Sequence, residues 1–291
     1  MDFITHDKTN ITTVKMQQIH DELKLKYLKY HDPWGFNYQT YLKALQFFNP
    51  IYEKYFRVRT FIHPSLQNAN QTQFIVFSNH SGQIPLDAIL ISISFLIHFS
   101  PPLVLRGMVE RFLAQLPFLG RLSSELGSVL GDRKNCEFLL EKGESILVFP
   151  EGVRGISKST KDFYHIQPFS QGFLRLAIKN KIPLLPVAVI GAEEMFPFVF
   201  NASSIAKMLG FPSLPISLNY FPLPSPIDIY IGEPISPPLD LSFDSPDIEL
   251  KKFLFQLEDQ VKALIKIGLE NRKVRFKNTF GNLLFNKSPK K

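Results

Sequence analysis

Apolar and polar positions divide most of the chain into two kinds of segment that follow one another. Short apolar runs predict buried strands at 74–78, 103–107, 145–149, 184–190 and 227–231. Longer stretches with apolar residues at helical spacing predict helices at 86–99, 109–116, 134–142, 170–179 and 247–270. Strands and helices in this order are typical of an α/β fold, in which helices flank a mostly central β-sheet.

The first 60 residues lack this order and are predicted to form an N-terminal helical region. Apolar residues recur there at near-helical spacing, at Ile19, Leu23, Tyr27 and Tyr30. The sequence Asp32-Pro33-Trp34-Gly35 then breaks the helix. A second helical stretch is predicted at 38–56, with an interruption at Pro50.

Composition fits a folded protein with a large core. The chain has 291 residues, of which 45% are hydrophobic and 20% charged. Its single cysteine, Cys136, cannot form an intramolecular disulfide, which fits a reducing compartment. We expect no secretory signal, because the N-terminus lacks an apolar stretch. The best candidate for a membrane span, 88–105, is marginal in length and contains His98 and two prolines, so a buried helix followed by a strand is favoured.

Positive charge is concentrated at the C-terminus. Residues 272–291 hold seven Lys or Arg and no Asp or Glu, which equals the whole formal net charge of +7. The same segment carries Phe276, Phe280 and Phe285. Basic and apolar side chains together are typical of a segment that binds an anionic lipid surface, and a solvated tail is the alternative. No signature of nucleic-acid binding is present, so nucleic acid is not an expected partner.

These patterns predict three parts and a location. We expect the N-terminal helical region at 1–60, an α/β domain at 61–271 and a basic amphipathic tail at 272–291. Either terminal part can contact lipid. The protein is therefore expected to associate with a membrane in a peripheral or monotopic way, on the cytoplasmic face.

Three polar clusters lie near the ends of predicted strands. They contain the candidate site residues Asn79, His80, Ser81, Gly82, Asp87, Arg133, Glu151, Gly152 and Arg154. In α/β sheets, sites gather at the carboxyl ends of strands, so the clusters can converge. The motifs of serine hydrolases, zinc proteases, Walker-type nucleotide enzymes and dinucleotide-binding enzymes are absent from the sequence, which argues against those classes.

Each candidate also has a plain structural explanation. Asp87 lies two residues after Pro85, so it suits the first turn of a helix. His80 is compatible with a hydrogen-bonded core histidine. Arg133 is compatible with a surface cation, and Glu151 with an acidic residue in a turn.

The residues of the clusters and their order along the chain favour a functional explanation over a structural one. They resemble the glycerolipid acyltransferase superfamily, which includes the lysophosphatidate and glycerol-3-phosphate acyltransferases. The similar blocks, in family order over about residues 75–195, are Asn79-His80 to Asp87, Gly127 to Arg133, Phe149 to Arg154, and Ile182 to Gly191. Six residues rather than four separate His80 from Asp87, and Val153 replaces the usual Thr or Ser. The form His-Ser-Gly-x-x-Pro-x-Asp resembles a branch that includes relatives acting on neutral glycerides.

The resemblance implies transfer of a fatty acyl group from a thioester donor to the hydroxyl of a glycerolipid or lysophospholipid. Acyl-CoA or acyl-carrier protein is the expected co-substrate, with no metal and no resident cofactor. We expect His80 to act as general base and Asp87 to orient it. One straight helix would hold them about 10 Å apart along its axis. Ser81-Gly82 must therefore turn the chain, and Pro85 must start the next helix.

Two arginines are the expected anion binders. Arg133 and Arg154 are expected to meet near a phosphate of the acceptor or donor. Glu151 is expected to orient one of them or to accept a hydrogen bond from an acceptor hydroxyl. The remaining residues expected to bind substrate are Asn79, Ser81, Gly82 and Gly152. A catalytically silent lipid-binding or scaffold protein on the same fold, and an acyl-thioesterase, remain as alternatives.

Overall fold

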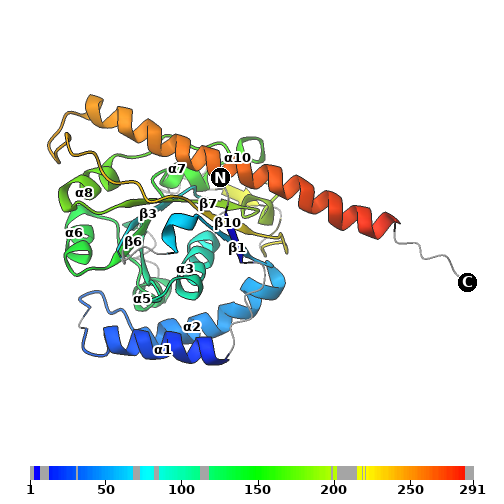
Figure 1. Ribbon diagram of the computed structural model, residues 1–291, viewed down its shortest axis with the longest axis horizontal. Coiled ribbons are helices and arrows are strands. Elements are labelled where there is room, and N and C mark those ends of the chain that lie inside the picture. The colour runs from blue at the N-terminus through cyan, green and yellow to red at the C-terminus, as the bar shows by residue number, and fades with distance from the viewer. Residues whose placement is uncertain are drawn as a thin grey trace, which may run out of the picture.

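The fold is seen in a computed structural model, which describes residues 3–6, 13–30, 32–67, 73–81, 85–111, 118–197, 199–201, 215–217, 219 and 221–285. Within these ranges an eight-stranded sheet runs through the centre of the molecule, with helices on both faces (Figure 1). This arrangement confirms the α/β fold class predicted from the sequence.

The central strands of the sheet are parallel. The strand order is β1-β2-β10-β7-β3-β6-β4-β5. The bounds are β1 Ile4–His6, β2 Arg59–Ile62, β3 Ile75–Ser78, β4 Leu105–Val109, β5 Val129–Leu130, β6 Ser145–Val148, β7 Leu184–Ile190 and β10 Asp228–Ile231. Strands β3 to β7 run parallel, whereas β10 is antiparallel to β7, and β1 to β2. A separate antiparallel pair is formed by β8 Val199–Asn201 and β9 Pro215–Ser217.

Helices cover the sheet in two groups (Figure 1). Their bounds are α1 Thr13–Tyr27, α2 Tyr38–Pro50, α3 Leu86–His98, α5 Leu119–Glu125, α6 Arg133–Glu141, α7 Val153–Ile156, α8 Gly172–Asn180 and α10 Asp247–Phe285. On one face α3 lies against the sheet, and α1 and α2 cover α3. On the other face α6, α8 and α10 pack directly on the strands. The far end of α10 projects beyond the sheet (Figure 1).

The strands are apolar because both of their faces are buried. In β3, Val76 packs toward α1–α3, whereas Ile75 and Phe77 pack toward α6, α8 and α10. Successive side chains of a strand point to opposite faces, so a strand covered on both sides is apolar at every position. This is why the central strands are predictable as short apolar runs.

The structure differs from the predicted elements mainly at the edges of the sheet. Strand β4 runs to Val109, so the helix predicted from residue 109 does not begin there; residues 112–116 of that prediction lie outside the described residues. Strands β1, β2 and β5 were not predicted, and β1 adds a strand to the N-terminal helical region. Helix α10 continues past residue 270 to Phe285.

The predicted helical spacing of the N-terminal region is confirmed, and its apolar side faces the protein core. Ile19, Leu23 and Tyr27 are buried against α2 and α3. Helix α2 ends at Pro50 and a π-helical turn follows it, as the predicted interruption requires. Between α1 and α2, the Asp32 carboxylate lies 2.6 Å from the guanidinium of buried Arg106 on β4. This ion pair ties the helical region to the sheet.

The start of the predicted basic tail is part of the folded domain. Arg272 is buried, and its guanidinium binds the Glu194 carboxylate and donates to the carbonyl of Pro226. Its charge is therefore not available to a lipid surface, which corrects the predicted role of this residue. Within the ranges that the structure describes, no helix combines the length and apolar composition needed to cross a membrane.

Candidate active site

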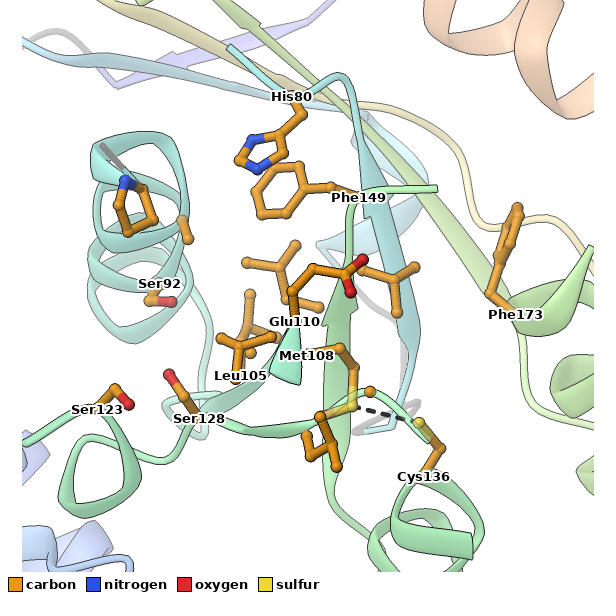
Figure 2. A pocket seen from close by; sticks show the side chains of 18 of the residues that line it. His80, Ser92, Leu105, Met108, Glu110, Ser123, Ser128, Cys136, Phe149 and Phe173 are labelled. Carbon is orange, nitrogen blue, oxygen red and sulfur yellow. Dashed lines mark hydrogen bonds between the residues drawn. The ribbon is translucent and has the colours of Figure 1, made fainter. Parts of the chain in front are cut away.

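Two of the three predicted clusters follow the carboxyl ends of two neighbouring parallel strands, and the third, Gly127 to Arg133, contains β5. Strands β3 and β6 pair directly and end at Ser78 and Val148. The chain therefore places His80 beside Phe149, and the two rings stack with their centroids 4.1 Å apart and an interplanar angle of 18° (Figure 2). The sequence reasoning missed this stacking partner, although Phe149 opens one of the quoted blocks.

The predicted contact between His80 and Asp87 is present. His80 Nδ1 lies 2.7 Å from Asp87 Oδ2. Asp87 is in the first turn of α3, directly after Pro85, while His80 is in the loop after β3. Gly82, which was expected to help turn this loop, lies outside the described residues.

The Asp87 carboxylate is fully buried and held in one orientation. Besides His80, its oxygens accept hydrogen bonds from the backbone N–H groups of Ser81 at 2.9 Å and Ala88 at 2.8 Å. Because His80 Nδ1 faces Asp87, Nε2 is the ring nitrogen that remains for a substrate proton. The geometry is that of a general base with a carboxylate that orients it.

Glu151 supports the backbone of the same histidine. One carboxylate oxygen accepts from the His80 N–H at 2.8 Å, and the other accepts from the Gln167 N–H at 2.7 Å and lies 2.9 Å from Lys158 Nζ. The cation beside Glu151 is thus a lysine, which corrects the expectation of an arginine partner. Sequence reasoning missed Lys158 because a lysine between two serines is typical of an exposed loop.

Lys158 is buried between two carboxylates. Its side chain is 4% exposed, and Nζ lies 3.4 Å from Glu193 Oε1 and 3.3 Å from the carbonyl oxygen of His80. Burial raises the pKa of Glu193 to about 7, and the neighbouring Lys158 opposes that rise. Three ionisable groups therefore share a dry region directly behind the histidine.

Two glycines give the third block its shape. Gly152 has φ +58°, a conformation that favours glycine. At Gly155, an added Cβ would lie 2.7 Å from the Cβ of His80, so no side chain fits there without moving the histidine. Gly152 lines the cavity described below.

Two predicted substrate-binding residues have structural contacts instead. The buried Asn79 amide donates to the carbonyl of Val189 at 3.1 Å and accepts from its N–H at 2.9 Å, which joins the end of β3 to β7. Ser81 is buried behind Asp87, and its hydroxyl has no partner among the described residues. Neither residue is among those that line the cavity. The expectation that Asn79 binds substrate is corrected to an anchoring role.

The two predicted arginines have different surroundings. Arg133 lines the cavity, donates to Glu137 at 2.8 Å and lies 4.0 Å from the ring centroid of Phe243. Arg154 is exposed on α7 and donates to the carbonyl of Pro168 at 2.7 Å, and it is not among the cavity-lining residues. The structure therefore does not bring the two guanidinium groups into one phosphate site.

A cavity of about 960 Å³ extends from His80. Its wall is mostly apolar; α2, α3 and β4 contribute Leu45, Ile89, Leu96 and Leu105, and β6, α6 and α8 contribute further residues. Figure 2 shows the carboxylate of Glu110 in the same space below the stacked rings. Cys136 also lines the cavity, but burial raises the pKa of its thiol to about 12, which keeps it protonated at neutral pH. The site thus offers an oriented base beside an apolar chamber.

Comparison with known proteins points to one family. Residues 60–190 match the family model described as Acyltransferase. An uncharacterized protein of Mycobacterium tuberculosis is 31% identical over 203 residues, covering 66% of this chain and 55% of that protein. The human "DGAT1/2-independent enzyme synthesizing storage lipids" is 24% identical over 186 residues, covering 64% of this chain and 55% of that enzyme.

A named acyltransferase and a solved structure also match this chain. The 1-acyl-sn-glycerol-3-phosphate acyltransferase of Limnanthes douglasii is 27% identical over 130 residues, 41% of each chain. The crystal structure of the 1-acyl-sn-glycerophosphate acyltransferase PlsC of Thermotoga maritima matches with a TM-score of 0.48 and 17% identity, over 87% of this chain and 95% of that one. The chain spans about half the length of the curated relatives it matches. The family model thus covers the segment that carries the β3 and β6 blocks, and residues 60–190 of this chain are similar to the Acyltransferase family.

Proposed function

We propose that the protein is an O-acyltransferase that moves a fatty acyl group from a thioester donor to the hydroxyl of a glycerolipid or lysophospholipid. The observation that carries this proposal is the His80–Asp87 pair, with Nδ1 2.7 Å from the carboxylate, on the wall of a large apolar cavity. In this reaction His80 Nε2 takes the proton of the acceptor hydroxyl, and the oxygen attacks the thioester carbonyl. The C–S bond breaks, and the thiolate leaves with the proton that His80 returns.

The side chains around the cavity support direct transfer between two substrates. Asp87 would stabilise the imidazolium that forms when His80 takes the proton. The thiol of Cys136 stays protonated at neutral pH, so it does not offer a nucleophile for a covalent acyl-enzyme. The apolar wall can bury a hydrocarbon chain, which supports a substrate with a long acyl group.

The proposed acceptor is a glycerolipid or lysophospholipid, either with or without a phosphate group. One relative carries the name of a 1-acyl-sn-glycerol-3-phosphate acyltransferase, and another of an enzyme synthesizing storage lipids. In this chain Arg154 turns away to Pro168, and the carboxylate of Glu110 lines the cavity. Both features favour an acceptor without a phosphate, because an anion beside a carboxylate is repelled, whereas Arg133 on the same cavity wall favours an acceptor with one, so a panel of acceptors decides.

We also propose contact with membrane lipids on the cytoplasmic face, in a peripheral or monotopic way, because a long-chain acceptor is scarce in bulk water. The donor would be acyl-CoA or acyl-carrier protein. The basic segment after Arg272 is the first candidate for lipid contact, and the N-terminal helical region is the second.

The direct test is transfer by the purified protein. Labelled acyl-CoA and acyl-carrier protein are each mixed with vesicles that contain lysophosphatidate, a lysophospholipid, a monoacylglycerol or a diacylglycerol, and the products are measured by mass. Acyltransfer predicts that thiol is released only when an acceptor is present, and that His80→Ala abolishes release. Thiol released without acceptor identifies a thioesterase instead. Absence of both thiol and lipid product, with lipid binding intact, identifies a silent lipid-binding protein.

A further inference from the structure

We infer that Lys158 is a positioning residue for the reaction: its buried ammonium neutralises Glu151 and holds the backbone of His80 in place for proton transfer. The inference rests on the proposed function, because it assigns a role in that reaction. Lys158 lies outside the sequence blocks of the site and was not among the predicted site residues.

The contacts of Lys158 converge on one residue, the histidine. Its Nζ lies 3.3 Å from the His80 carbonyl oxygen and 2.9 Å from Glu151, and Glu151 accepts from the His80 N–H at 2.8 Å. Both backbone polar groups of His80 are thus held by one ion pair. The imidazole is fixed separately, by the hydrogen bond to Asp87 and by stacking on Phe149. The ion pair therefore fixes the position of the His80 backbone, and Asp87 fixes the orientation of the imidazole ring.

A purely structural explanation fits this cluster poorly. Lys158 is 4% exposed, Glu151 is fully buried and Glu193 is 2% exposed. Removing charges from water is unfavourable, and a buried ion pair is often no more stabilising than well-packed apolar side chains of similar volume. A buried ion pair that contacts the backbone of a catalytic base is better explained by placement, because displacing a reacting group by about 1 Å can lower the rate about 100-fold.

The charge of Lys158 also affects the protonation of the histidine. The charged or titratable groups that face His80 or Lys158 are Asp87, Glu151, Glu193 and, across the cavity, Glu110. Carboxylates near an imidazole favour its protonated form, and a nearby ammonium opposes them. Loss of Lys158 leaves Glu151 without its cation. The acid limb of the pH profile of kcat/KM should then move to higher pH.

The experiment compares three variants on the full chain. Lys158→Met removes the ammonium and keeps the length of the side chain, and Lys158→Arg keeps the charge. The matched control is Lys161→Met, because Lys161 is exposed in the same segment. For each variant, kcat, KM, the pH profile of kcat/KM and the thermal unfolding midpoint are measured with the acceptor that gives the highest turnover.

We expect Lys158→Met to lower kcat about 10- to 100-fold with little change in KM. The acid limb of the pH profile of kcat/KM should move to higher pH. Lys158→Arg should recover most of kcat and the original limb, and Lys161→Met should match the wild type. A folded Lys158→Met with unchanged kcat and limb overturns the inference. If that variant does not fold, Glu151→Gln decides: it removes one of the two carboxylates beside Lys158, so the acid limb should move to lower pH, and an unmoved acid limb overturns the inference. Failure of the proposed function is distinct, because the wild type would then transfer no acyl group.

Discussion

Asp87→Asn separates the charge of this carboxylate from its shape. The side chain is fully buried and accepts three hydrogen bonds, from His80 Nδ1 and from the backbone N–H groups of Ser81 and Ala88. An asparagine fills the same space but has one oxygen and one NH₂ group. In either orientation of the amide, one of the two backbone N–H groups loses its acceptor. In one orientation the NH₂ group also faces His80 Nδ1 and places the ring proton on Nε2, the nitrogen that must act as base.

The size of the effect follows from the distance. With Nδ1 2.7 Å from the carboxylate oxygen, the centres of the two charges in the imidazolium–carboxylate pair are about 4 Å apart. At an effective dielectric constant of about 20, that pair is worth about 4 kcal/mol, which corresponds to a rate factor of about 10³. The wrong tautomer raises the loss to about 10⁴. We therefore expect Asp87→Asn to lower kcat about 10³- to 10⁴-fold.

The assay is acceptor-dependent release of thiol at pH 7.5 or so, with product identified by mass. Thermal unfolding is measured beside it, because the backbone N–H group that loses its acceptor should lower stability by about 1–3 kcal/mol. The matched control is Asp259→Asn, which removes a carboxylate from the exposed face of α10, where Asp259 pairs with Lys262. If folded Asp87→Asn keeps more than about a tenth of wild-type kcat, the role assigned to Asp87 is wrong.

Three further predictions test other parts of the structure. Gly155→Ala should lower kcat at least about 10-fold, because the added Cβ would lie 2.7 Å from the Cβ of His80. The control is Gly172→Ala, because nothing lies within 4 Å of a Cβ added there. Equal activity of the two variants would contradict the packing argument. Burial lowers the pKa of His98 to about 3, so the unfolded chain binds more protons below pH 6.5 and wild-type stability falls with falling pH. His98→Leu should reduce that loss of stability by about 2 kcal/mol between pH 7 and 5. A difference in stability between His98→Leu and the wild type that does not change with pH would contradict this prediction. Co-sedimentation with anionic vesicles should weaken with salt and on deletion of 273–291, where each cation contributes about 1 kcal/mol; binding indifferent to both would move the contact to the N-terminal helices.

The sequence predicted the central strands and the contact between His80 and Asp87. β7 was predicted at its observed bounds, because a parallel strand buried on both faces is apolar at every position and a glycine, Gly191, follows its last residue. The contact between His80 and Asp87 was expected from the family resemblance, and the glycine and proline between them favour a turn followed by a helix start. Both features depend on residues that are close along the chain.

Only the tertiary structure decided which charges surround the histidine. Lys158 and Arg154 lie in one short segment, yet the first is buried beside Glu151 and the second is exposed and bonded to Pro168. Arg272, the first cation of the basic segment, is likewise buried against Glu194. Each outcome depends on which distant element packs over the side chain. The partner of Lys158 is 35 positions away in the sequence, at Glu193, and that of Arg272 is 78 positions away, at Glu194. The residues next to a lysine or arginine in the sequence are the same whether such a partner or water surrounds its charge. Packing across the sheet therefore decides its role.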